Sequence, residues 1–168
     1  MSNVNYDPVK AHEYYEKHKK LKGKRSTKGF SETQKEQWSY AKEQLKQEHK
    51  ANNEAIAENK KERLEAISEE VSDKKEALTD EAQSKIETLR EQLKNMPKEQ
   101  KKAMRAKIQD AIGKIKNTLK TEKGALGAAG AQAKELTKAD ASAAKEAEKA
   151  SYEQKLDAAH SHIKGGGK

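Results

Sequence analysis

The sequence lacks cysteine altogether, and among its 168 residues it has only two prolines, one tryptophan, one phenylalanine and five tyrosines. Without cysteine, disulfides and thiolate metal sites are excluded. No segment approaches the roughly 18 consecutive apolar residues that suggest a membrane span, and no apolar N-terminal run resembles a signal peptide. We therefore expect a soluble protein of a reducing compartment with no membrane partner.

The composition predicts an all-α protein made of long helices. Charged residues make up 38% of the chain and hydrophobic residues 32%, which is low for a compact core. A chain this polar either buries a thin apolar seam between helices or stays partly disordered. Abundant Ala, Glu, Lys, Gln and Leu favour the helical alternative.

Apolar residues recur at intervals of eleven. Because eleven residues make about three helical turns, each series stays on nearly the same side of a helix. The two series lie four residues apart and form one narrow stripe, which predicts packing against a partner helix. The series are Leu45, Ile56, Ile67, Leu78 and Leu89, and Val71, Ala82, Leu93, Met104, Ile115 and Leu126. The predicted helix seam is Ile67, Val71, Leu78, Leu89 and Leu93.

Helix signals divide the chain into five segments. A basic, aromatic N-terminal docking segment occupies residues 1–30, with a helix expected from Asp7-Pro8 to about Gly23. Ser31 and Gln34 have the spacing of a capping box, so a long acidic helix should run from about Glu32 to Lys94 within segment 31–95. Pro97 should begin a basic helix over 96–123. A Gly/Ala hinge over 124–131 and a flexible, Ala-rich polar tail over 132–168 complete the prediction. The part of the tail from Gln132 to Ile163 can form a helix, but one weakly committed to any core.

Two arrangements around Pro97 remain open at this point. Residues 31–95 carry twelve basic and sixteen acidic side chains, whereas residues 96–123 carry nine basic and three acidic ones. This asymmetry favours a helical hairpin, in which the basic helix folds back on the acidic one. The eleven-residue series that continues from Val71 across Pro97 to Leu126 favours a kinked coiled-coil rod instead.

The N-terminal segment is the predicted docking site. A run of cations without an intervening acid could contact nucleic-acid phosphates, an acidic protein surface, or solvent alone. Six of the seven aromatic residues lie within residues 6–40, where they favour a small core through Tyr15, Leu21, Phe30 and Trp38, or alternatively base stacking. The candidate docking residues are Tyr14, Tyr15, Lys19, Lys20, Lys22, Lys24 and Arg25.

Nothing in the sequence indicates catalysis. There is no nucleophile elbow, phosphate-binding glycine loop or plausible triad, and the carboxylates suit Glu–Lys pairing on helix faces. The five histidines do not have the four-residue spacing of a zinc-binding helix face. His160 and His162 could bind metal only adventitiously. We expect no enzyme activity, no cofactor and no metal site.

The segment Tyr6–Tyr15, YDPVKAHEYY, followed by His18–Thr27, HKKLKGKRST, resembles the start of small Lys/Glu-rich helical proteins from tailed-phage and prophage structural gene clusters of Gram-positive bacteria. The resemblance covers about thirty residues. It implies a virion structural or capsid-assembly protein, scaffold-like or a minor capsid component. It assigns no catalytic or binding residue.

We therefore expect a phage structural or assembly protein that acts by helical packing and N-terminal docking, in the virion or the host cytoplasm. Its partners would be other virion proteins or further copies of itself, with DNA contacted through phosphates. A sequence-independent nucleic-acid-binding accessory protein is the alternative. A third possibility is a small inhibitor of a host enzyme, which no feature of the sequence specifically indicates.

Overall fold

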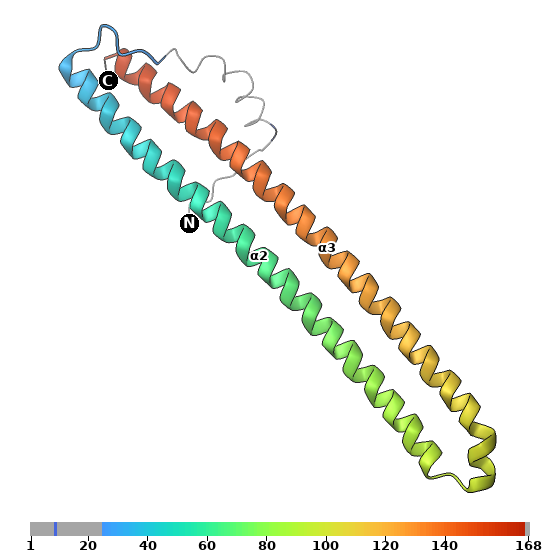
Figure 1. Ribbon diagram of the computed structural model, residues 1–168. Helices are drawn as coiled ribbons and strands as arrows, with labels where there is room; N and C mark the ends of the chain where they lie inside the picture. The colour runs from blue at the N-terminus through green and yellow to red at the C-terminus, as the bar shows by residue number, and fades with distance from the viewer. Residues whose placement is uncertain (1–8, 10–24, 167–168) are drawn as a thin grey trace. The chain divides into compact units, whose positions relative to one another are not determined.

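Two long helices form the fold (Figure 1). The structure is a computed structural model that describes Val9 and residues 25–166. Helix α2 spans Glu32–Lys94 and helix α3 spans Lys98–Lys164, and no strand occurs among the described residues. The helices run antiparallel on either side of a short turn, so the chain is a helical hairpin and the kinked rod is excluded. Of the helix expected between Asp7 and Gly23, only Val9 is among the described residues, and it is helical.

Helix α2 begins and ends where the sequence predicts. The Ser31 Oγ accepts a hydrogen bond from the Gln34 backbone N–H at 3.1 Å, and the Gln34 Oε1 accepts one from the Ser31 N–H at 2.8 Å. This reciprocal pair is the predicted capping box. Gly29, with a φ of 87°, supplies the left-handed residue of the preceding turn. The helix then continues without a break to Lys94, even through the adjacent residues Asn52 and Asn53.

The turn between the helices is set by Pro97. The last turn of α2 ends with Asn95 N–H bonded to the Glu91 carbonyl at 3.0 Å. The Pro97 carbonyl then accepts from Lys101 N–H at 2.9 Å, which starts the hydrogen-bond series of α3. Proline is tolerated here because it precedes the first helical residue, where its missing N–H and fixed φ cost little. The predicted break is confirmed.

The predictions of a hinge over 124–131 and a flexible tail over 132–168 are wrong. Helix α3 continues through Gly124, Gly127 and Gly130 and ends at Lys164, so it is more than twice as long as the predicted basic helix 96–123. Glycine in a helix costs about 1 kcal/mol relative to alanine, which packing can outweigh. At Gly130 the reason is visible: a Cβ added there would lie 2.7 Å from the Val71 Cγ2. The small residues allow close approach of the two helices.

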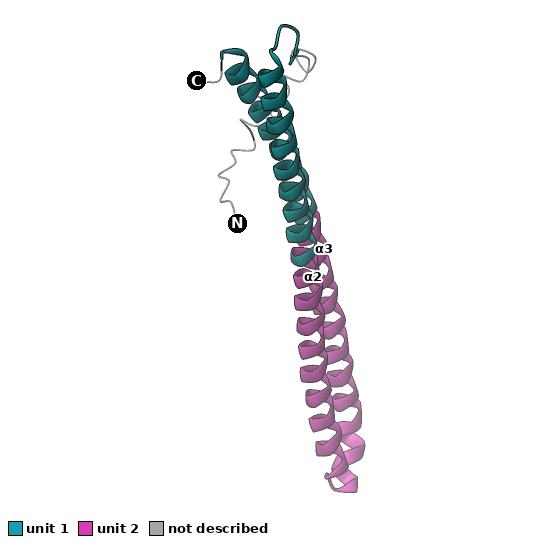
Figure 2. Cartoon of the chain, turned by 90° about the vertical axis from the view of Figure 1, so that its left-hand side faces the viewer, with its two compact units in different colours: residues 1–62, 137–168 teal, residues 63–136 magenta. Residues whose placement is uncertain are grey.

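The helix pair divides into two compact units (Figure 2). Unit 1 contains residues up to Glu62 together with Thr137–Lys168, and unit 2 contains Arg63–Leu136. In each unit a stretch of α2 pairs with a stretch of α3. Unit 1 therefore joins the beginning of α2 to the end of α3, and unit 2 holds the turn.

Eleven-residue spacing organises both helices. On α2, every eleventh residue from Trp38 is buried or half-buried, in the series Trp38, His49, Lys60, Val71, Ala82 and Leu93. On α3 the matching series is Ile108, Leu119, Gly130, Ala141, Tyr152 and Ile163. The apparent continuity of the Val71-to-Leu126 series across Pro97 therefore reflects equal spacing on two separate helices. An exposed glutamate series, Glu32, Glu43, Glu54, Glu65, Glu76 and Glu87, has the same period.

Candidate functional site

An aromatic cluster in unit 1 packs the start of α2 against the end of α3. Trp38 is 4% exposed and packs with Leu156 and Ile163. The His160 ring lies 5.4 Å from the Phe30 ring and 5.2 Å from the Trp38 ring, measured between centroids. Its Nε2 lies 2.7 Å from the Ser26 carbonyl oxygen, and since a carbonyl only accepts, Nε2 carries the hydrogen. His160 is therefore a packed structural residue.

The Arg25 guanidinium joins the start of the described chain to α3. Its Nη2 lies 2.8 Å from Glu153 Oε2 and its Nη1 lies 2.7 Å from Asp157 Oδ1. Partial desolvation lowers the pKa of Arg25, but the hydrogen bonds and charges of the two carboxylates outweigh it and hold the pKa above its ordinary value. Arg25 thus makes a two-armed ion pair that is partly shielded from water.

A polar network occupies the interior of unit 1. Glu148 is 2% exposed, and its Oε1 accepts from Asn52 Nδ2 at 3.1 Å and lies 3.2 Å from His49 Nδ1. Asn53 Nδ2 lies 3.2 Å from His49 Nε2, an arrangement in which Nε2 can accept while Nδ1 donates to Glu148. The His49 ring stacks on Tyr152 at 4.3 Å. Asn52 therefore reaches across to α3, whereas Asn53 contacts His49 of its own helix, and α2 continues through both.

A lysine-rimmed groove lies beside this network. It has a volume of about 950 Å³ and contains Lys46 and Lys50 from α2 with Lys145 and Lys149 from α3. The His49 and Tyr152 rings form part of its wall. Four ammonium groups from two helices around one groove suit a ligand that carries several negative charges. Glu54 and Glu153 also line it, and Glu153 is already paired with Arg25.

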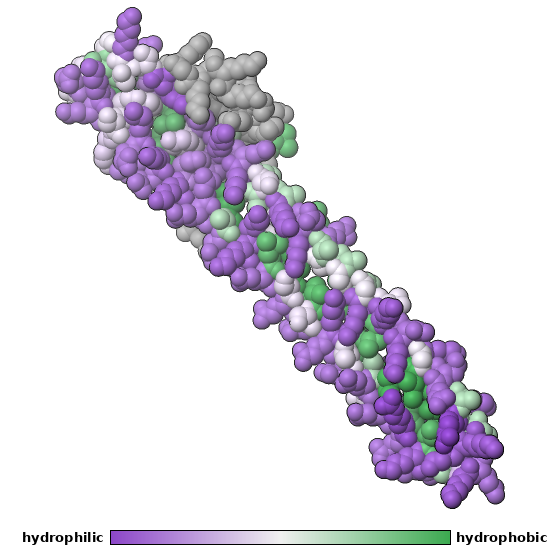
Figure 3. All heavy atoms as spheres, in the orientation of Figure 1, coloured by the Kyte–Doolittle hydropathy of each residue, from purple (hydrophilic) through white to green (hydrophobic). Residues whose placement is uncertain are grey.

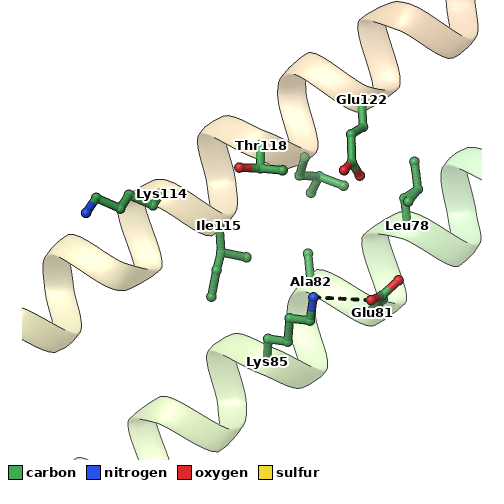
Figure 4. A pocket seen from close by; sticks show the side chains of 9 residues that line it. Leu78, Glu81, Ala82, Lys85, Lys114, Ile115, Thr118 and Glu122 are labelled. Carbon is green, nitrogen blue, oxygen red and sulfur yellow. Dashed lines mark ion pairs between the residues drawn. The ribbon is translucent and has the colours of Figure 1, made fainter.

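An apolar groove follows the line between the helices in unit 2. One part has a volume of about 330 Å³ (Figure 4). Its lining combines four apolar residues, Leu78, Ala82, Ile115 and Leu119, with Glu81, Lys85, Lys114, Thr118 and Glu122. A second part of about 670 Å³ is lined by Leu78 and Leu126 with three alanines. Leu78, Glu81 and Glu122 line both parts, so the two form one groove. Figure 3 shows hydrophobic residues along this line, bordered by hydrophilic ones.

The predicted seam residues all lie on α2 in unit 2. Ile67, Val71, Leu78, Leu89 and Leu93 are each half-buried. Val71 faces Gly130 across the helix pair, and Leu78 lines the apolar groove. The fully covered members of this unit are instead Ala82, Ile86 and Ile108.

Most predicted docking residues lie outside the described residues: Tyr14, Tyr15, Lys19, Lys20, Lys22 and Lys24. Arg25 is described, and its guanidinium is engaged by Glu153 and Asp157 of the same chain. Of the predicted small core, Phe30 and Trp38 lie in the aromatic cluster. Its other members come from α2 and from the end of α3: Ala41, Leu45, Tyr152, Leu156, Ala159 and Ile163.

Sequence reasoning missed the contribution of residues 137–163. Thr137, Glu148 and His160 are buried there, as are Ala141, Ala147 and Ala150. An available signal was the eleven-residue series that begins at Ile108. It continues through Ala141 and Tyr152 to Ile163 but has small or polar side chains at several positions.

Within the described part of the chain, no group of three or more His, Cys, Asp or Glu side chains could hold a metal ion. Neither described helix is apolar enough over a sufficient length to cross a membrane. Comparison with known protein families, curated proteins and solved structures finds no match.

Proposed function

We propose that this chain is a non-enzymatic structural or assembly protein of a tailed-phage particle, either scaffold-like or a minor capsid component. One observation carries the proposal: α2 and α3 pair through a single repeating pattern, and in unit 2 this pairing leaves a continuous apolar groove uncovered. A helix pair with such a groove is suited to packing against further protein surface. The resemblance of Tyr6–Thr27 to phage structural proteins supplies the biological setting.

Unit 2 and the N-terminal segment would have different roles. Unit 2 offers the apolar groove for helical packing, whereas the N-terminal segment would dock onto another virion protein through Tyr14, Tyr15, Lys19, Lys20, Lys22 and Lys24. Arg25 differs from these residues, because two carboxylates hold its guanidinium. We assign Arg25 the role of anchoring the end of the docking segment to α3. The protein would occur in the virion or, before assembly, in the host cytoplasm.

The test is to follow the protein through particle assembly in the phage or prophage that encodes it. Procapsids and mature particles would be purified separately and the chain quantified by mass spectrometry. A scaffold-like protein should be abundant in procapsids and depleted from mature particles, whereas a minor capsid protein should persist in both. Absence from both particles, together with normal particle yield after gene deletion, would overturn the proposal.

The docking residues require a matched comparison in the same assay. Replacing Tyr14 and Tyr15 with alanine should reduce incorporation into particles, because aromatic anchors carry much of the energy of protein interfaces. Tyr40 offers the control, since it is 69% exposed on α2 and lines neither groove. Tyr40→Ala should leave incorporation unchanged. Equal loss in both variants would remove the N-terminal segment from the proposed mechanism.

The lysine-rimmed groove supports a second candidate function, sequence-independent binding of nucleic acid. Phosphate contacts by Lys46, Lys50, Lys145 and Lys149 would make the affinity fall steeply with salt, by about 0.9 in log–log slope for each contact with duplex DNA. Replacing all four with glutamine should then flatten the slope by about 3 to 4. Fluorescence anisotropy with duplexes of unrelated sequence would measure this.

Matched charge removal elsewhere supplies the control for that experiment. Lys98, Lys102, Lys107 and Lys116 are exposed and line neither groove. Changing these four to glutamine lowers the net charge equally and should flatten the slope far less. The same slope in both variants would show that only overall charge matters, and unchanged affinity in both would remove this candidate.

A further inference from the structure

The apolar groove of unit 2 extends onto the outer surface of α3. Leu126 and Ile115 lie within it, and Ala125 and Ala129 line its α3 side. Leu136 is 60% exposed and lies eleven residues after Ala125, so it occupies the same face of the helix. Side chains of this kind on one face bury favourably only against another apolar surface.

Four of the five charged side chains that line this groove, Lys74, Glu81, Lys85 and Lys114, form ion pairs within their own helices, and the fifth, Glu122, is in none of these pairs. Glu70 Oε1 lies 2.8 Å from Lys74 Nζ, Glu81 Oε1 lies 3.2 Å from Lys85 Nζ, and Asp110 Oδ2 lies 3.3 Å from Lys114 Nζ. Covering the groove would therefore leave few uncompensated charges near its edge, where an unpaired charge would oppose burial. The matching partner is apolar at its centre with few unpaired charges at its edge. The same face of a second copy has both properties.

The distribution of charge between α2 and α3 distinguishes two possible arrangements of two copies. In unit 2, residues 63–94 of α2 carry six basic and nine acidic side chains, whereas residues 98–136 of α3 carry ten basic and four acidic ones. Two face-to-face arrangements have two-fold symmetry. If the axis is parallel to the helices, α2 of each copy lies against α3 of the other, with both turns at the same end. If the axis runs across the helices, α2 lies against α2 and α3 against α3, with the turns at opposite ends.

We propose that the apolar groove of unit 2 is covered by the same groove of a second copy, with the two turns at the same end. This arrangement places each net-acidic α2 segment beside a net-basic α3 segment, whereas the other places like charge beside like. The result is a four-helix bundle over unit 2 in which neighbouring helices are antiparallel. The inference rests on the proposed function only in taking the groove to be a protein-packing surface.

Because the sequence has no cysteine, a single introduced cysteine can test the arrangement by disulfide cross-linking. Asn95 is exposed in the turn, so the full-length Asn95→Cys variant should form an intermolecular disulfide rapidly on mild oxidation at micromolar concentration. Ala128→Cys provides the control, because Ala128 is exposed on α3 but lines no part of the groove. A dimer that cross-links at position 95 and not at 128 supports the proposal. A dimer without cross-linking at position 95 overturns the arrangement.

The groove itself is tested by two matched double variants. Ala125→Glu with Ala129→Glu places two charges in the groove and should weaken dimerisation by about 100-fold or more, with helical content retained. Ala128→Glu with Ala131→Glu makes the same charge change on neighbouring exposed positions outside this groove and should leave the dimer intact. Light scattering coupled to size exclusion gives the mass, and circular dichroism gives the helix content.

Each outcome separates this inference from the proposed function. A wild-type monomer across the micromolar range would overturn the second copy as occupant, and so would equal weakening by the two double variants. A monomer that still enters procapsids would leave the assembly role standing with another virion protein in the groove. A dimer that never enters particles would support the inference and remove the proposed function.

Discussion

Unit 1 and unit 2 are built from the same two helices with the same eleven-residue spacing, yet they bury different kinds of side chain. Unit 1 buries Trp38, Leu156 and Ile163 with several alanines, and also the polar residues Thr137, Glu148 and His160. Unit 2 buries only Ala82, Ile86 and Ile108 fully among its hydrophobic residues, and leaves the rest of its apolar series half-exposed. The same eleven-residue spacing therefore supports one unit that buries polar residues and one unit that leaves apolar residues partly exposed.

The difference teaches how specificity is divided along the chain. A series of apolar residues alone would allow α2 and α3 to pair in more than one register, because each eleven-residue interval resembles the next. Polar contacts such as Glu148 with Asn52, and Gln34 Nε2 with the Ile163 carbonyl at 3.0 Å, join particular residues of α2 to particular residues of α3. We infer that unit 1 fixes which residues of α2 meet which residues of α3, while unit 2 supplies surface.

The largest effect is expected from removing the centre of the unit 1 core. Trp38→Ala should destabilise this unit by about 3–5 kcal/mol, because a large buried aromatic leaves a cavity. Native-state hydrogen exchange should then show faster exchange in residues 32–62 and 137–164 than in 63–136. Ile86→Ala, the corresponding change in unit 2, should give the opposite pattern. Uniform loss of protection in both variants would mean that the two units unfold as one.

Glu148 tests whether polar contacts specify unit 1. Glu148→Leu leaves the His49 and Asn52 donors without their buried acceptor and should cost about 1–3 kcal/mol. Glu148→Gln retains an acceptor oxygen and should cost less. Urea denaturation followed by circular dichroism gives the free energy of unfolding. If the leucine variant is as stable as the wild type, hydrophobic packing alone suffices in unit 1.

Two glycine-to-alanine substitutions in the unit 2 part of α3 should change stability in opposite directions. Gly124 has open space around it, so Gly124→Ala should stabilise the helix by up to about 1 kcal/mol. Gly130→Ala should instead destabilise by about 1–3 kcal/mol, because its Cβ would meet Val71 Cγ2 at 2.7 Å. In the Gly130→Ala background, Val71→Ala should recover part of the loss. Equal stabilisation by both glycine substitutions would contradict the close approach of the helices at Gly130.

The smallest effect is expected at an exposed ion pair of unit 2. A hydrogen bond from Lys74, together with its charge, lowers the pKa of Glu70 below its ordinary value. The contribution is therefore present above the ordinary glutamate pKa and is lost as pH falls through the lowered value. Glu70→Gln should shift the melting temperature only slightly at pH 7 and not at all at strongly acidic pH. A large shift at pH 7 would place Glu70 in a contact beyond its own helix.

Much of the hairpin could be predicted because its signals are local. The Ser31–Gln34 capping box, the bounds of α2 and the break at Pro97 each depend on residues a few positions apart. The charge asymmetry between residues 31–95 and 96–123 favoured the hairpin for the same reason, since it is a property of each segment alone. The five seam residues follow from the same period, although their half-burial depends on what α3 places opposite them.

The role of residues 124–163 could not be predicted in the same way. Gly124, Gly127 and Gly130 indicate flexibility by intrinsic propensity, and the alanines beyond them offer little apolar area. Only the presence of α2 alongside makes small side chains advantageous, as Val71 does at Gly130. Similarly, the sequence gives no reason to bury Glu148 until His49 and Asn52 are brought to it.

By itself the sequence determined the helical period, the start and end of α2, the turn and the charge of each segment. These follow from hydrogen bonds, propensities and side-chain spacing within a few helical turns. Tertiary structure alone decided that α3 continues to Lys164, that Arg25 and His160 serve packing, and that the apolar groove remains open in unit 2. Those outcomes depend on pairs of residues far apart in the sequence, such as Arg25 with Asp157, whose energies exist only once the two helices lie side by side.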